Sequence, residues 1–177
     1  MLHSSSSETI PSDDRTTPAI ETVKTVNLDS SDFFRYNSDG PDIVINKMSG
    51  WSLPNYELIP PLCISSVIPG DYNHKGINLY LNCFLIPKET TSGILELEVS
   101  FLYPDIDPLK DKPRYELSNI RSDIIPSDKI KHINLICSAE GRYAKPDGKL
   151  YITINRLYHK DDFVGTIYVN RGRIEYL

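Results

Sequence analysis

The sequence predicts a mainly β protein, built as an antiparallel sheet or a β-sandwich with few short helices and a disordered N-terminal tail. Apolar and polar residues alternate at every second position in several segments, as they do in half-buried strands. Thirteen Pro are scattered along the 177 residues, and β-branched residues crowd most apolar segments, which disfavours long helices. An α+β fold stays possible, because two short segments can each form a single helical turn.

Residues 1–18 are predicted to be a disordered tail, and residues 19–177 a single β-rich domain. The tail is rich in Ser, Thr, Pro and acidic residues, and it has too few large apolar side chains to offset the entropy cost of ordering. The rest of the chain has the length of one ordinary domain. The three Cys are widely separated and odd in number, which argues against a disulfide framework.

The two clearest strands are expected at residues 77–85 and 95–101, where apolar residues occupy every second position. One face of the first strand is apolar, and the other face carries Asn78, Tyr80, Asn82 and Phe84. The segment 87–93 has the length of a hairpin loop, so we expect these two strands to pair with each other.

More strands are expected in the C-terminal third. A strand over residues 133–137 precedes a turn at residues 145–148, where Pro146 can enter the turn and Gly148 can adopt a positive φ. The chain is then predicted to end in an antiparallel meander. Its three strands are expected at residues 149–158, 163–169 and 173–177, and its two turns at residues 159–162 and 170–172.

Three other segments complete the expected outline. Residues 31–36 and 127–130 can each form one helical turn, the second with Ser127 as its N-cap. Residues 104–113 are polar and charged, and they are predicted to form a long, mobile connection.

Residues 50–62 hold the only Trp together with three Pro. Because Pro donates no backbone hydrogen bond, we do not expect a central strand here, and the segment should wrap over the sheet or protrude from it. A loop that covers the core with Trp51 buried and a loop that docks onto another protein are both compatible with this composition. In a docking loop, the contact residues would be Trp51, Tyr56, Leu58, Pro60 and Pro61.

The sequence predicts no catalytic, cofactor-binding or metal site. None of the four His has a partner at the three- or four-residue spacing of a helical metal site, and no Gly-x-Ser-x-Gly motif or glycine-rich phosphate loop occurs. The adjacent Asp161 and Asp162 lie in a predicted turn, which explains them without catalysis. We therefore expect a protein without enzymatic activity, without a cofactor and without a small-molecule substrate.

The C-terminal part of the chain is basic although the whole chain is acidic. Residues 129–177 contain nine basic and five acidic residues, whereas the full chain has a net charge of −5. Basic side chains on one face would attract anionic lipid or nucleic acid, and isolated ones would merely protect sheet edges from pairing. The candidate contacts with an anionic surface are Lys129, Lys131, Arg142, Lys145 and Lys149.

Residues 137–146, Cys-Ser-Ala-Glu-Gly-Arg-Tyr-Ala-Lys-Pro, resemble a segment of rhabdovirus matrix proteins in which a Cys is followed by Glu-Gly-Arg, an aromatic residue and a Pro. Residues 148–162 are similar to the matrix-protein strand that begins with Gly and ends at a Tyr followed by paired Asp. The chain length matches the plant-infecting members. The acidic tail departs from the basic arm and Pro-Pro-x-Tyr motif of the animal-virus members, so membrane binding through the tail and recruitment of budding machinery do not carry over.

The resemblance implies a non-enzymatic viral matrix-type structural protein with a mixed fold. Such a protein self-associates and links the nucleocapsid to the membrane or glycoprotein during virion assembly. Its partners would be further copies of itself, the nucleocapsid and an anionic membrane surface, in the virion and the host-cell cytoplasm. Two alternatives stay open, a jelly-roll viral coat or movement protein and a small β-sandwich ligand-binding module. Open oligomers, closed shells and a monomer with one deep pocket would distinguish the three.

Overall fold

The computed structural model describes residues 23–36, 38, 40–45, 47–54, 59–86, 92–104, 114–125, 127–157 and 159–177. The predicted disordered tail, residues 1–18, lies outside the described residues, as does the predicted mobile connection apart from Pro104. In the described part of the chain there is no helix, and so none long and apolar enough to cross a membrane.

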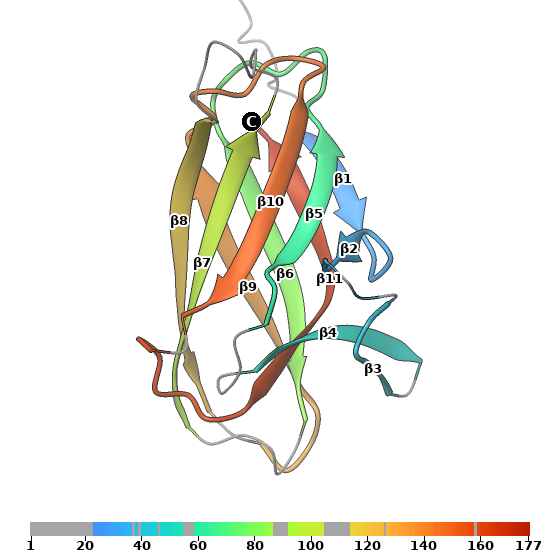
Figure 1. Ribbon diagram of the computed structural model, residues 1–177, viewed down its shortest axis with the longest axis vertical. Coiled ribbons are helices and arrows are strands. Elements are labelled where there is room, and N and C mark those ends of the chain that lie inside the picture. Colours follow the sequence, from blue (N-terminus) through green and yellow to red (C-terminus); the bar gives the residue numbers. More distant parts are fainter. Residues whose placement is uncertain are drawn as a thin grey trace, which may run out of the picture.

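The described residues form a β-sandwich of two antiparallel sheets, as the sequence predicts (Figure 1). Sheet 1 has the strand order β3 (Ile43–Ile45), β4 (Met48–Pro54), β11 (Thr166–Tyr176), β6 (Ile77–Leu85) and β9 (Lys131–Ala139), and β1 (Lys24–Leu28) also pairs with β11. Sheet 2 has the order β2 (Phe33–Phe34), β5 (Leu62–Val67), β10 (Lys149–Arg156), β7 (Gly93–Tyr103) and β8 (Arg114–Ile124).

Strand β11 is paired along both of its edges. Strand β6 follows one edge from Ile167 to Tyr176. On the other edge, β4 pairs with residues 166–169 and β1 pairs with residues 172–176. In Figure 1, β3 and β4 extend sideways at one end of the sandwich, and β1 lies beside the other half of β11.

The core lies between the two sheets and is built by the expected alternation. The apolar faces of β6 and β7 point inward, and Leu81 and Leu97 are fully buried. The strands predicted at residues 77–85 and 95–101 are therefore confirmed, with their buried faces assigned correctly. Cys83 and Cys137 are also buried, and all three Cys are free thiols.

The pairing predicted between residues 77–85 and 95–101 is wrong. Strand β6 pairs with β9 and β11 in sheet 1, whereas β7 pairs with β8 and β10 in sheet 2. The chain therefore crosses from one sheet to the other between them. Each strand has one continuously apolar face, which points inward, and this pattern is satisfied equally by neighbours in one sheet and by strands facing each other across the core.

The predicted C-terminal meander is also wrong. Strand β10 belongs to sheet 2, and residues 166–176 form the single strand β11 of sheet 1. The turn expected at residues 170–172 is a β-bulge, because the register with β6 shifts between Val169 and Arg171. A Gly beside polar residues fits a bulge as well as a turn, since both relax the regular pleat.

The shorter predicted features have mixed outcomes. The turn at residues 145–148 is confirmed by a hydrogen bond from Gly148 N to Lys145 O of 2.9 Å, but the positive φ of 60° belongs to Asp147. Residues 31–36 do not form a helical turn, since a turn over residues 29–32 leads directly into β2. Ser127 accepts a hydrogen bond from Lys129 N at 3.2 Å without starting a helix.

The Trp-containing segment forms a strand over part of its length. Residues 48–54 are β4, and Pro54 is its last residue, where the missing N–H is tolerated. Trp51 is buried in the core, and its indole Nε1 donates to Ser30 O at 2.8 Å. The expectation that Trp51 lies in a loop is therefore wrong, and the expectation that it can be buried is confirmed.

Candidate functional site

Two rows of side chains run across the outer face of sheet 1, because cross-strand partners in antiparallel strands point to the same side. The first row contains one residue from each of four strands, Asn27 on β1, Arg173 on β11, Tyr80 on β6 and Ile136 on β9. The neighbouring row contains Arg171, Asn82 and Asn134. The rows are therefore fixed by the pairing of strands that are far apart in sequence.

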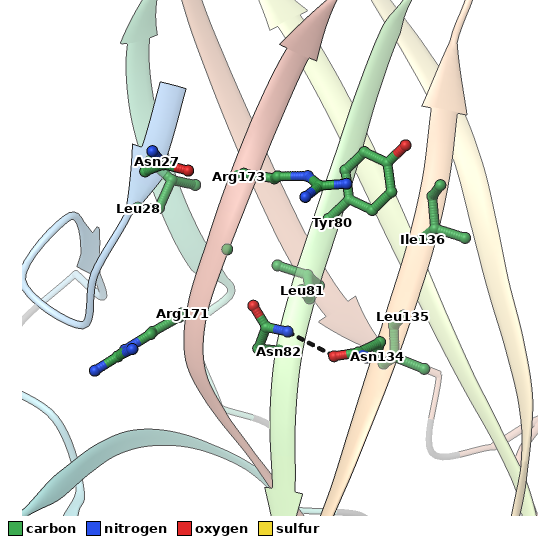
Figure 2. Close-up of a pocket in the computed structure, with 11 residues that line it drawn as sticks. Asn27, Leu28, Tyr80, Leu81, Asn82, Asn134, Leu135, Ile136, Arg171 and Arg173 are labelled. Atoms are coloured by element: carbon green, nitrogen blue, oxygen red, sulfur yellow. Dashed lines mark hydrogen bonds between the residues drawn. The ribbon is translucent and has the colours of Figure 1, made fainter. Parts of the chain in front are cut away.

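These two rows surround a groove of about 610 Å³ (Figure 2). Its polar lining comes from the outward side chains of the two rows, and residues of the inward rows lie beneath it. The residues of the inward rows that line it are Leu28, Leu81, Leu135 and Gly172.

The bulge in β11 brings both arginines to this outer face. Tyr168 points outward opposite Phe84, and uninterrupted alternation would also turn Asn170 and Gly172 outward. The extra residue at Asn170 reverses the alternation, so Arg171 lies opposite Asn82 and Arg173 lies opposite Tyr80. The Asn170 carboxamide is held by donating to Ser49 O at 2.9 Å. Bulges are frequent next to binding sites because they redirect side chains in this way.

Gly172 allows β6 and β11 to approach closely beneath the groove. A Cβ at this position would lie 2.7 Å from the backbone oxygen of Tyr80, which is closer than carbon and oxygen can approach. Only a residue without a side chain therefore fits here with the sheet in its present form.

Asn82 and Asn134 form a directly bonded pair of carboxamides in the groove. Asn82 Nδ2 donates to Asn134 Oδ1 at 2.5 Å, and both side chains are exposed. In the described part of the chain, neither side chain makes another hydrogen bond. This pair therefore offers Asn82 Oδ1 as an acceptor and Asn134 Nδ2 as a donor, side by side on neighbouring strands.

Arg173 is fixed in place by two neighbours. Its guanidinium lies over the Tyr80 ring, 4.1 Å from the ring centroid, and its Nε lies 3.0 Å from Glu175 Oε1. The Glu175 side chain is mostly buried, whereas the Arg173 side chain is half-exposed. The stack of Arg173 on Tyr80 is thus a preformed, flat element of the groove.

Arg171 is exposed and differs from Arg173 in its surroundings. Among the described residues, none forms a hydrogen bond or ion pair with its guanidinium. Hydrogen bonds from the Ser31 hydroxyl and backbone, together with the charge of Arg171, hold the pKa of Asp29 below its ordinary value. Figure 2 shows the Arg171 side chain leaving β11 on the side away from the Asn82–Asn134 pair.

The next outward row, beyond Asn82 on β6, is filled by aromatic packing. Phe84 stacks on Tyr168 with ring centroids 5.2 Å apart, and it is fully buried although it points to the outer face. Strand β4 covers it, since a Cβ at Gly50 would lie 2.8 Å from the Phe84 ring. The polar rows are therefore bounded on this side by β4.

The residues that line the groove are suited to binding by hydrogen bonds and ring contacts. They include carboxamides, guanidinium groups and a phenol, and none of the eleven is Asp, Glu, His or Cys. In the described ranges, no group of three or more His, Cys, Asp and Glu is placed to hold a metal ion.

A smaller hollow of about 350 Å³ lies where β8 meets the segment after β9. Glu116 points into this region and accepts hydrogen bonds from the backbone N of Gly141 and Arg142, at 3.2 and 2.8 Å. Its carboxylate therefore serves to hold the chain after β9 in place.

The five basic residues predicted to contact an anionic surface do not lie in one patch. Lys131 begins β9 opposite Leu85, and its Nζ donates to Ile125 O at 3.0 Å, with Lys129 close by in sequence. Arg142 lies just beyond the opposite end of β9. This strand has nine residues and is therefore roughly 27 Å long at about 3.4 Å per residue. Arg142 forms an ion pair with Glu140. Lys145 and Lys149 follow in the turn and at the start of β10. Whether either group contacts an anionic surface stays a prediction.

The residues of the predicted docking loop are also dispersed. Trp51 is buried in β4, Pro60 is exposed and Pro61 is half-buried. Tyr56 and Leu58 lie outside the described residues. Tyr80 and Asn82 are expected on one strand face from the sequence, and Arg171 and Arg173 are two of the nine basic residues of residues 129–177. The sequence does not show that these side chains lie together, because their pairing depends on long-range register.

No family model and no curated protein matches the chain. Several solved structures are distantly similar to the chain. One contains the CBM22-1 and GH10 modules of Clostridium thermocellum endo-1,4-beta-D-xylanase 10B complexed with xylohexaose, with 11% identity, TM-score 0.45, and coverage of 85% of this chain and 27% of that chain. Others are CBM35 from Cellvibrio japonicus Abf62 (5% identity, TM-score 0.41, 85% and 92% covered) and the non-crystalline cellulose-specific module CBM28 (12%, 0.41, 78% and 78%). The chain spans about a quarter of the xylanase chain, and likenesses this distant carry no statement about function.

Proposed function

We propose that this chain is a non-catalytic binding module that takes a hydroxyl-rich ligand, such as a short oligosaccharide, in the groove on the outer face of sheet 1. The observation that carries this proposal is the Asn82–Asn134 pair, which presents an unused acceptor and an unused donor within the groove. A sugar hydroxyl both donates and accepts hydrogen bonds, so it matches a carboxamide in both functions.

The dimensions of the groove support the same class of ligand. Its volume of about 610 Å³ lies within the range of roughly 300–1,000 Å³ that is common for small-molecule sites. The outer surface also offers ring and aliphatic contacts, through the Arg173–Tyr80 stack and through Ile136, which is 51% exposed. Polar and apolar contacts in alternation suit a sugar ring, which has hydroxyl groups at its edge and C–H groups on its faces.

Binding should be tested by isothermal titration calorimetry with neutral and acidic oligosaccharides of about three to six residues. We expect at least one to bind, and replacement of both Asn82 and Asn134 by Ala to weaken that binding by about tenfold or more. The matched control replaces Asn119 and Asn155 by Ala, two carboxamides that share one row on the outer face of sheet 2. Binding by none of the sugars, or equal loss in the control, would overturn the proposal.

A matrix-type structural function is the second candidate, and it stays a prediction. The observation that favours self-association is the presence of exposed apolar side chains on the outer face of sheet 2. Tyr115 and Leu117 lie on β8 and Val67 lies on β5, with two strands between them, and each is more than half exposed. Sedimentation velocity over a wide concentration range should show open, growing oligomers for a matrix-type protein and closed shells for a coat protein.

The anionic-surface prediction can be tested in the same preparation. Conversion of Arg142, Lys145 and Lys149 together to Glu should abolish sedimentation with anionic liposomes if this end of the sandwich is the contact, and high salt should weaken it. A monomer at all concentrations without lipid binding would remove this second candidate.

A further inference from the structure

We propose that the ligand of the groove is an acidic sugar, and that Arg171 binds its carboxylate. This inference rests on the proposed function and adds the chemical class of the ligand. It is carried by the charge of the groove and by the different surroundings of its two arginines.

The charge of the groove is positive and is not balanced by its own lining. Arg171 and Arg173 are its charged residues among those that line it, and no lining residue is acidic. Glu175 is the acidic residue of the next row on β11, and it is paired with Arg173. Asp29 is not part of the lining, and although the charge of Arg171 helps to lower its pKa, its Oδ1 is taken by the backbone N and hydroxyl of Ser31 at 2.7 and 2.6 Å.

Among the described residues, Arg171 is the groove arginine whose five N–H donors all lack a partner. The Arg173 guanidinium packs its flat face on Tyr80 and uses its Nε for Glu175, so it keeps only its Nη donors, in a fixed orientation. In the described part of the chain, the Arg171 guanidinium has no hydrogen-bond partner and is exposed beside the groove. A guanidinium group binds a carboxylate through two parallel N–H···O bonds, and a lone hydroxyl cannot provide this geometry.

A neutral ligand would be a poorer partner for this groove. A neutral ligand that covered Arg171 would remove water from a charged group without supplying an opposite charge, and this desolvation opposes binding. A carboxylate compensates for the lost water. Arg171 would therefore favour acidic sugars over their neutral forms.

The spacing of the rows fits one ligand that reaches both Arg171 and the carboxamide pair. Asn134, Asn82 and Arg171 lie on three adjacent strands in one row, so their backbone positions span roughly 10 Å at about 4.8 Å per strand. The Arg171 side chain extends beyond this span, away from the carboxamide pair (Figure 2), so a ligand that reaches both must be longer than two sugar rings. Figure 2 shows Arg171 and Asn134 at opposite ends of the row, so the carboxylate lies on the β1 side and the hydroxyl groups lie over β6 and β9.

The experiment compares pairs of probes that differ only in charge. Trigalacturonic acid and a hyaluronan tetrasaccharide are titrated into the full chain, each beside its fully methyl-esterified form. At low salt we expect at least one acid to bind about tenfold or more tightly than its ester. Arg171→Gln should remove this difference, and Arg171→Lys should restore it in part, because Lys keeps the charge and loses the fork.

Arg121→Gln is the matched control, since Arg121 is an exposed arginine on the outer face of sheet 2. It should leave the preference for the acid unchanged. Equal binding of acid and ester, or an unchanged preference in Arg171→Gln, would overturn this inference and leave the proposed function standing. Failure of every neutral and acidic sugar to bind would overturn both.

Discussion

Arg156 and Asp161 form a buried, two-pronged ion pair at one end of the sandwich. Arg156 Nε lies 2.6 Å from Asp161 Oδ2, its second prong joins Asp161 Oδ1 at 3.2 Å, and the two side chains are 3% and 0% exposed. The remaining guanidinium N–H groups donate to three backbone oxygens, those of Leu53, Phe163 and Gly165. The pair therefore connects β10 in sheet 2 to β4 in sheet 1 through a single side chain.

Asp161→Asn should destabilise the protein strongly. The change leaves the buried Arg156 guanidinium without a countercharge, and removing one partner of such a pair costs about 3–5 kcal/mol. Urea unfolding followed by circular dichroism measures the loss. Glu140→Gln is the control, because its ion pair with Arg142 is exposed and its removal should barely move the midpoint. Similar midpoints for the two variants would contradict a buried, satisfied pair.

Leu97→Ala and Leu81→Ala should each lower the free energy of unfolding by about 2–5 kcal/mol, because both side chains are fully buried and leave a cavity. Glu96→Ala should cost less than about 1 kcal/mol, since Glu96 points outward and its ion pair with Arg121 of 3.4 Å is largely exposed on the Arg121 side. Chemical denaturation measures all three. Equal losses at positions 96 and 97 would mean that the register of β7 is shifted by one residue.

Gly172→Ala should both destabilise the fold and impair the groove. The added methyl group would meet the Tyr80 backbone oxygen at 2.7 Å, so β6 and β11 must separate, at about 1–3 kcal/mol. Separation of these strands also moves Tyr80 relative to Arg173. Thermal unfolding and titration with the best-binding sugar measure the two effects. Gly40→Ala is the control, because nothing lies within 4 Å of a Cβ there.

Asp42 should make the free energy of unfolding depend on pH in the acidic range. Burial raises its pKa, but hydrogen bonds from Ser52 and the charge of Arg35 outweigh this and hold the pKa below its ordinary value of 3.8. A lowered pKa in the folded state stabilises the protein above pH 3.8, and this contribution disappears as the pH falls through the folded-state pKa. Asp42→Asn should therefore lower stability at pH 6 and flatten the loss between about pH 4 and 2. Denaturation curves across this range that run parallel for the two proteins would contradict the assignment.

Strands in which apolar and polar residues alternate regularly could be predicted from the sequence, together with the face that each strand buries. Alternation at residues 77–85 was sufficient to place Leu81 inside and Asn82 outside, because the two faces of a strand differ in hydrophobicity. The alternation does not show to which of the two sheets a strand belongs. A strand that pairs within a sheet and a strand that packs across the core bury the same apolar face, so β6 and β7 were paired wrongly.

The groove depends on features that carry little signal within a single sequence. Asn82 bonds to a residue 52 positions away, and Arg171 reaches the outer face only because one extra residue at Asn170 reverses the alternation. The Asn-Arg-Gly sequence at residues 170–172 has the composition of a turn and of a bulge alike. Long-range register had to be known before these side chains could be recognised as one group.

The double pairing of β11 has a consequence for the kinetics of binding. Because β6 borders one edge of this strand and β4 and β1 border the other on either side of the bulge, the amide hydrogens of residues 167–169 and 172–176 should exchange only when the sandwich unfolds as a whole. A ligand would then restrict side-chain rotamers alone, with little loop ordering before contact. Uncharged variants at Asn82 or Asn134 should consequently associate at nearly the wild-type rate and differ in residence time.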